Sequence, residues 1–219
     1  MYNISIITPT KNSERYILDN LKSIHLHQNL YNINMEHIIV DGNSTDKTVN
    51  IIEQFKSKYN LNIKIIVNEN DQGVYDAINK GMQYVSGDIW SVLNSDDMYY
   101  PTTLHSVINT FRTNLEGLDA VYGNVDMIDS NGKFIHTLYL PKFNLEYLIL
   151  KGYCLTILQP ALFLRNSVIN KVRCFDTEYK YASDYDYCIR LGLNYNLKLM
   201  PNTSRFNYLG QYRTKKNSN

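Results

Sequence analysis

The segment "DIWSVLNSDDMYYP" (residues 88–101) decides the fold class of this chain. A short apolar run ends in two adjacent carboxylates, Asp96 and Asp97. Pro101 then opens a stretch whose apolar residues recur at helical spacing. A strand that leads through a polar loop into a helix is the repeating unit of α/β proteins, so the question is how often this unit recurs.

The same unit occurs three more times before residue 88. Short apolar, β-branched runs predict strands at 4–10, 37–42, 62–69 and 88–94. Amphipathic segments predict four helices. The first begins at about Ser13, the third covers roughly 74–85 and the fourth begins at Pro101. The second has Ser44 or Thr45 as its N-cap and Asp46 in its first turn. Four strand–helix units in succession require right-handed crossovers. They predict a mostly parallel sheet with helices on both faces.

The second half of the chain is less regular. Residues 119–140 predict two strands around an Asn131–Gly132 turn, residues 155–166 another strand, and residues 181–195 a helix. We therefore expect a single α/β domain over residues 1–219. Its first part, about 1–100, would bind a nucleotide, and the mixed part, about 101–219, would bind a second substrate.

Composition excludes several classes of protein. The 219 residues are 44% hydrophobic and 20% charged, with a net charge of +1, which is typical of a soluble globular protein and gives no sign of nucleic-acid binding. Cys154, Cys174 and Cys188 are too widely spaced for a zinc site or a disulfide framework. With no basic leader at the N-terminus, these features favour a cytoplasmic protein. The segment 139–153 could contact a membrane surface or pack in the core.

Polar clusters follow the end of each predicted parallel strand. They are "TPTKN" (8–12), Asp41, "NENDQG" (68–73) and the pair Asp96–Asp97. Because ligands of open α/β sheets bind beyond the carboxyl ends of the strands, we expect these clusters to form one crevice.

The acidic pair is explained best by a divalent cation. Adjacent carboxylates repel one another, and hard oxygen ligands suit Mn²⁺ or Mg²⁺, which complete their coordination with water and substrate phosphates. Such a cation would neutralise a departing diphosphate. The alternative is that Asp96 caps a turn and Asp97 is solvated. The dipeptide alone favours this alternative, whereas the position at a strand end, with Asp41 at another, favours the cation.

Four separated blocks carry a resemblance to a known family. They are "ISIITPTKN", "IIVDGNSTDKT", "ENDQGVYDAINKGMQYVSGDIWSVLNSDDMYYP" and "ASDYDYCIRL", and they span residues 4 to about 191. In this order they resemble glycosyltransferase family 2. The resemblance implies a GT-A fold and inverting transfer of a sugar from a nucleoside-diphosphate donor.

The resemblance also implies roles for individual residues. Donor contacts fall on Pro9 and Thr10 beside the nucleoside, Asp41 at the base or ribose, Asp71, Gly73, and Asp96 at the ribose or the waters of the metal. Asp97 corresponds to the direct metal ligand. Lys80 either reaches the same pocket or is a solvated helix lysine.

Asp184 corresponds to the catalytic base. An acceptor hydroxyl that attacks an anomeric carbon must lose its proton, so a base is required. Its alternatives are a helix N-cap or a partner for Arg190, and Asp186 is a weaker candidate because it would face another side of the helix. Ser183 replaces the acid usual in the family, and Gln159 alone remains of a His-Gln pair on the acceptor side.

The sequence thus predicts a metal-dependent transferase that adds a single sugar, most simply from a UDP-sugar, to a glycan or glycolipid hydroxyl in surface-polysaccharide assembly. One alternative is a nucleotide-sugar binding module that has lost catalysis. A sugar nucleotidyltransferase is less consistent, since "TPTKNSER" lacks the glycines of a phosphate loop.

Overall fold

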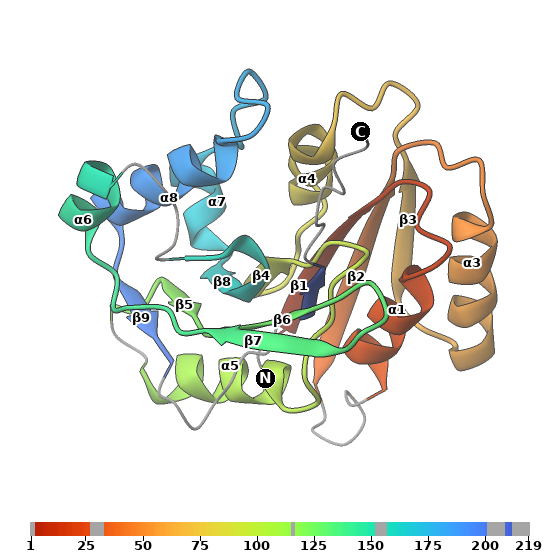
Figure 1. Ribbon diagram of the computed structural model, residues 1–219, viewed down its shortest axis with the longest axis horizontal. Helices are drawn as coiled ribbons and strands as arrows, with labels where there is room; N and C mark the ends of the chain where they lie inside the picture. The colour runs from red at the N-terminus through yellow and green to blue at the C-terminus, as the bar shows by residue number, and fades with distance from the viewer. Residues whose placement is uncertain (1–2, 27–32, 115–116, 152–156, 201–208, 212–219) are drawn as a thin grey trace.

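The computed structural model describes residues 3–26, 33–114, 117–151, 157–200 and 209–211 (Figure 1). A seven-stranded sheet forms its centre, in the order β3-β2-β1-β4-β8-β5-β9. Its strands are β1 (Asn3–Thr10), β2 (Asn34–Asp41), β3 (Ile63–Val67), β4 (Ile89–Val92), β5 (Ala120–Tyr122), β8 (Leu162–Arg165) and β9 (Leu197–Leu199). All adjacent pairs are parallel except those of β8, which runs antiparallel to β4 and β5. The predicted mostly parallel sheet is confirmed.

Helices cover both faces of this sheet (Figure 1). One face carries α4 (Val74–Met82), α6 (Leu145–Lys151), α7 (Ser167–Val172) and α8 (Ser183–Asn194). The other carries α1 (Ile17–His25), α3 (Thr48–Tyr59) and α5 (Thr103–Thr113). The strands are buried on both sides because side chains alternate between the two faces. Ile6 packs with α5, for example, and Ile7 packs with α4.

Three helices begin later than the sequence predicted. The chain from Ser13 to Tyr16 forms a turn, and α1 begins at Ile17. Ser44 is not an N-cap, because its side chain is bound to Asp41 and α3 begins only at Thr48. The turn that contains Pro101 ends before α5 begins at Thr103. For α3, the Ser44 side chain is bound to the end of the preceding strand and is therefore not available as a cap.

The hairpin of the second half is confirmed, but one strand was misplaced. β6 (Val125–Ile128) and β7 (Phe134–Leu138) pair antiparallel around the turn at Gly132, and with β10 (Leu209–Gln211) they form a small second sheet. The preceding residues were expected to belong to the hairpin, yet they form β5 in the main sheet. In the predicted strand 155–166, residues 155–156 lie outside the described residues. The short 3₁₀ helix η1 (Gln159–Ala161) leads into β8.

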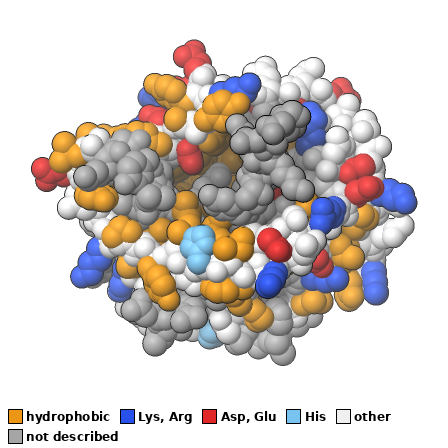
Figure 2. Space-filling view, in the orientation of Figure 1, with side chains coloured by type: hydrophobic (Ala, Val, Ile, Leu, Met, Phe, Trp, Pro, Cys, Tyr) orange, Lys and Arg blue, Asp and Glu red, His pale blue; other side chains and the backbone are white. Residues whose placement is uncertain are grey.

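The segment 139–153 is described as far as residue 151. This part both packs in the core and presents an apolar surface. Leu148 of α6 is fully buried, whereas Tyr147, Ile149 and Leu150 on the same helix are exposed. Hydrophobic side chains accordingly gather at the left of Figure 2, on the side where α6 and α8 lie. None of the described helices has the length and apolar character needed to cross a membrane.

Candidate active site

The end of β1, the loop after β3 and the first turn of α4 enclose one cavity. It has a volume of about 210 Å³ and is lined by Pro9, Thr10, Lys11, Asp71, Gly73, Val74 and Ala77. Sequence reasoning singled out four of these residues, namely Pro9, Thr10, Asp71 and Gly73. Parallel pairing explains how residues more than sixty positions apart come together, because β1, β2 and β3 all end at the same edge of the sheet.

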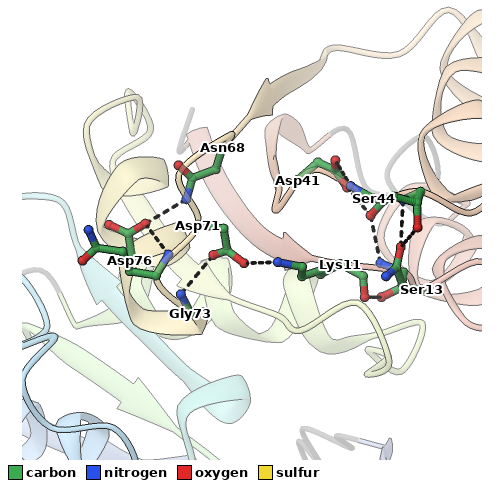
Figure 3. Close-up of polar contacts among 11 residues, drawn as sticks. Lys11, Ser13, Asp41, Ser44, Asn68, Asp71, Gly73 and Asp76 are labelled. Atoms are coloured by element: carbon green, nitrogen blue, oxygen red, sulfur yellow. Dashed lines mark hydrogen bonds and ion pairs between the residues drawn. The ribbon is translucent and has the colours of Figure 1, made fainter.

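Asp71 is the polar centre of this cavity. One carboxylate oxygen of Asp71 lies 2.9 Å from the ammonium of Lys11, and the other accepts a hydrogen bond of 3.1 Å from the backbone N–H of Gly73 (Figure 3). The Asp71 side chain is only 11% exposed, and this ion pair and this hydrogen bond hold its carboxylate in one orientation. Sequence reasoning included Lys11 in the polar cluster 8–12 but gave it no role of its own. Its position directly after the end of β1 was the available signal.

Thr10 lines the same cavity and carries a polar side chain. Its hydroxyl is buried, and it has no hydrogen-bond partner among the described residues. A buried hydroxyl without a partner costs free energy, which a ligand can repay by supplying the missing hydrogen bond. The walls formed by Pro9, Val74 and Ala77 are apolar. The cavity therefore suits a flat, partly polar group.

Asp41 and Lys80 lie near this edge but line neither cavity described here. Both carboxylate oxygens of Asp41 accept hydrogen bonds from Ser44, one from its N–H at 2.9 Å and one from its hydroxyl at 2.6 Å. Asp41 is 1% exposed. The ammonium of Lys80 lies 3.1 Å from the side-chain oxygen of Asn68, whose amide in turn donates to Asp76. In this structure both residues shape the loops of the edge, and the donor contacts expected of them stay predictions.

The acidic pair after β4 is held by α1. The side-chain amide of Asn20 donates to the backbone oxygens of Asn94 (3.0 Å) and Asp97 (2.9 Å), at the two ends of the turn. The hydroxyls of Ser13 and Ser95 lie 2.8 Å apart. These buried contacts fix the turn against the helix.

The two aspartates of that turn face different surroundings. Asp97 is 1% exposed. Burial raises the pKa of the Tyr99 phenol, and the negative charge of Asp97 raises it further. Asp96 is half-buried and lines a second cavity of about 300 Å³. This cavity lies between α1, the turn and the β6–β7 hairpin, where Arg15 donates to the backbone oxygen of Ser130 at 2.9 Å.

Asp184 lies in the first turn of α8, and its two structural alternatives are not observed. The N-cap of α8 is Ala182, and the partner of Arg190 is Asp186, with an N···O distance of 2.7 Å. Asp184 is half-buried, and one of its carboxylate oxygens accepts a hydrogen bond from the backbone N–H of Tyr185. The neighbouring Ser183 is fully buried.

Gln159 precedes β8 in the η1 turn. Its side-chain nitrogen is buried, and no described residue accepts a hydrogen bond from it. Asp184 and Gln159 line neither of the two cavities. The structure thus gathers four of the predicted donor-binding residues and leaves the acceptor-side residues on separate elements.

Comparison with known proteins shows the family of this chain. The model of "Glycosyl transferase family 2" matches residues 5–177, most of the chain. The chain belongs to glycosyltransferase family 2. The fold is accordingly GT-A, as the solved structure of S. aureus TarS 1–349 in complex with UDP-GlcNAc also indicates. It superimposes with a TM-score of 0.75 at 24% identity, over 96% of this chain and 59% of that one.

Two named relatives are longer than this chain. A "PGL/p-HBAD biosynthesis glycosyltransferase" of Mycobacterium bovis (strain BCG / Pasteur 1173P2) is 31% identical over 156 residues, which are 71% of this chain and 57% of the relative. The "Minor teichoic acid biosynthesis protein GgaB" of Bacillus subtilis (strain 168) is 28% identical over 190 residues, 84% of this chain and 20% of that protein. The chain therefore spans little more than half of the first relative and a fifth of the second.

Proposed function

We propose that this chain transfers one sugar, with inversion, from a nucleoside-diphosphate sugar to a hydroxyl of a glycan or glycolipid. A single observation carries the proposal: the cavity that joins Pro9, Thr10, Asp71 and Gly73, in a chain of glycosyltransferase family 2. A UDP-sugar is the simplest donor, because the similar TarS structure contains UDP-GlcNAc. One named relative acts in PGL/p-HBAD biosynthesis and another in minor teichoic acid biosynthesis, and the second of these favours surface-polysaccharide assembly.

In this proposal the donor lies along the edge of the sheet. The nucleobase of the donor packs between Pro9 and the first turn of α4, near Thr10 and the Asp71 carboxylate. The diphosphate extends toward the turn that carries Asp96 and Asp97. Asp184 accepts the proton of the attacking acceptor hydroxyl at a carboxylate oxygen, while the bond from the anomeric carbon to the diphosphate oxygen breaks.

A divalent cation, Mn²⁺ or Mg²⁺, fits this turn when it arrives with the nucleotide. The described residues hold no group of three or more Asp, Glu, His or Cys able to bind a metal without help. Mg²⁺ commonly takes one or two carboxylates and completes its shell with phosphates and water, so one accessible acid suffices. Asp96 lines a cavity, and Asp97 would bind directly only after its buried side chain turned outward. The bound cation would supply positive charge to the departing diphosphate.

Calorimetric titration with UDP tests donor and metal binding. We expect binding to the wild-type protein to strengthen at least tenfold when Mn²⁺ is present. Asp96→Asn should remove this enhancement, and Asp97→Asn should do so only if the second carboxylate contacts the ion. Equal UDP affinity with and without Mn²⁺ in the wild type would contradict the metal requirement.

Turnover of the donor tests catalysis separately. A set of UDP-sugars is screened for UDP release in the presence of Mn²⁺, first with water and then with added glycan acceptors. Asp184→Asn should keep UDP affinity and lower turnover by roughly 10²- to 10⁴-fold, the usual contribution of a general base. Tight UDP binding without any turnover would instead indicate a binding module that has lost catalysis.

The setting of the reaction is also part of the proposal. We place the protein in the cytoplasm, with the exposed apolar residues of α6 available for peripheral contact with a membrane that holds lipid-linked acceptors. Sedimentation with anionic lipid vesicles checks this contact, and Leu150→Ser should reduce the fraction that sediments. Equal sedimentation of the variant would remove α6 from the contact.

A further inference from the structure

The chain between α7 and α8 is bound to α4 by hydrogen bonds. The side-chain amide of Asn79 donates to the backbone oxygen of Phe175 at 2.8 Å, and the backbone N–H of Phe175 donates to the side-chain oxygen of Asn79 at 2.8 Å. The two residues are 96 positions apart. One side chain therefore satisfies both backbone groups of a residue in a loop, as a neighbouring strand would do.

Aromatic rings reinforce this link from α4 to α8. The ring of Phe175 stacks on Tyr75 of α4, with centroids 5.7 Å apart and planes 12° apart. It also stacks on Tyr187 of α8, at 4.2 Å and 8°. Phe175 and Tyr187 are 5% and 1% exposed. Three nearly parallel rings thus run from one helix to the other, and such contacts are specific in geometry.

Arg190 fastens the same segment to α8 by hydrogen bonds. Its guanidinium donates to the backbone oxygens of Val172 and Cys174, the latter at 3.0 Å, and pairs with Asp186 on its own helix. Arg has a planar fork of donors, so these bonds fix the segment in orientation as well as distance. Residues 172–175 are therefore held from both sides, by α4 and by α8.

Each of the two linked helices carries part of the proposed active site in its first turn. Val74 and Ala77 of α4 line the cavity proposed for the donor, and Asp184 of α8 is the proposed base. We propose that Asn79 and Phe175 are positioning residues, which set the distance and angle of Asp184 relative to the donor. This inference rests on the proposed function and adds to it the contacts that hold donor side and base side together.

The physical reason for such a link is the sensitivity of displacement reactions to geometry. A displacement of about 1 Å at the reacting groups can cost on the order of a hundredfold in rate. Asp184 belongs to a half of the chain that reaches the donor only through packing between elements distant in sequence. Side chains that fix this packing would affect turnover without touching the substrate.

Two variants test the inference by independent routes. Asn79→Ala removes the two hydrogen bonds, and Phe175→Leu keeps them but removes the stacked ring. We expect both to lower kcat of UDP-sugar hydrolysis by roughly ten- to hundredfold, with the KM for the donor and the affinity for UDP with Mn²⁺ unchanged within about twofold. Asn114→Ala is the matched control, since its amide also bonds a backbone oxygen, on the other face of the sheet. This control variant should lower Tm about as much as Asn79→Ala does and should leave kcat unchanged.

The Asp184→Asn background separates positioning from general loss of structure. If Asn79 acts through Asp184, Asn79→Ala should produce no further loss of residual turnover in that background, whereas a merely structural effect would add to it. Wild-type kcat in both single variants would overturn the positioning role and leave the proposed function standing. Full turnover of Asp184→Asn would instead overturn the base assignment and, with it, this inference.

Discussion

At the scale of single residues, a glycine at the end of β2 permits the central ion pair of the donor cavity. A Cβ atom added to Gly42 would lie 2.7 Å from a carboxylate oxygen of Asp71 and 3.3 Å from the side chain of Lys11. Gly73, whose N–H binds the other oxygen of Asp71, has a φ of +121°, a backbone conformation that side chains disfavour. The orientation of one carboxylate thus depends on two residues without side chains.

Replacement of Gly42 tests this dependence. In Gly42→Ala the new methyl group should push Asp71 away from Lys11 and weaken UDP binding about tenfold or more, with a stability loss of about 1–3 kcal/mol from overpacking. Calorimetric titration and chemical denaturation measure the two effects. Gly117→Asn serves as control, because it also alters a glycine, far from the cavity, and should leave UDP binding unchanged. Unchanged binding in Gly42→Ala would mean that Asp71 need not pair with Lys11.

At the scale of elements, a chain of buried polar groups joins α1, β2 and β1. A ring nitrogen of His25 lies 3.0 Å from one of His37, whose other nitrogen lies 2.9 Å from the hydroxyl of Thr8. Burial lowers the pKa of His25 from 6.5 to about 4. Burial, and then the nearby charge of His25, lowers the pKa of His37 well below its usual value. Both rings are therefore neutral at pH 7.

The pH dependence of stability follows from these lowered pKa values. Below pH 6.5 the unfolded chain binds protons at both histidines and the folded chain does not. The stability that the two neutral histidines contribute is therefore fully present above about pH 6.5 and falls as the pH drops toward 4. Each histidine contributes up to about 1.4 kcal/mol per pH unit in that interval. Urea denaturation between pH 7 and 4.5 gives the free energy of unfolding at each pH. This free energy should change less steeply with pH in His25→Gln than in the wild type. The exposed His136, changed to Gln, should leave the slope unaltered, and equal slopes in all three proteins would refute this account.

At the scale of the whole molecule, the strand order joins the two halves of the chain. β8, from the second half, pairs with β4, from the first, and Trp90 lies opposite Leu164 in that pairing. Trp90 is the single tryptophan of the chain and is 1% exposed. The core around α4 and α8 contains residues from both halves. The cluster between α1, α3 and the sheet lies within the first half, but the two larger clusters both combine residues of the two halves.

We therefore expect the chain to unfold as one unit. Trp90 fluorescence reports the junction of the halves, and far-ultraviolet circular dichroism reports all helices, so the two urea transitions should coincide. Leu164→Ala should shift both midpoints together, with a loss of about 2–5 kcal/mol for a buried leucine. Separate transitions for the two signals would show that residues 1–100 form an independent domain.

The amino-acid sequence determined the parallel sheet, its flanking helices and the edge where the polar clusters gather. Strand periodicity is local, and the handedness of crossovers leaves few topologies. Only the tertiary structure decided which acids face a cavity. Asp41 is bound to Ser44, Asp97 is buried and Asp96 is accessible, because contacts from α1 and from neighbouring loops orient each turn. Phe175 joins α4 to α8 through residues remote in the chain, and no local pattern encodes such a contact.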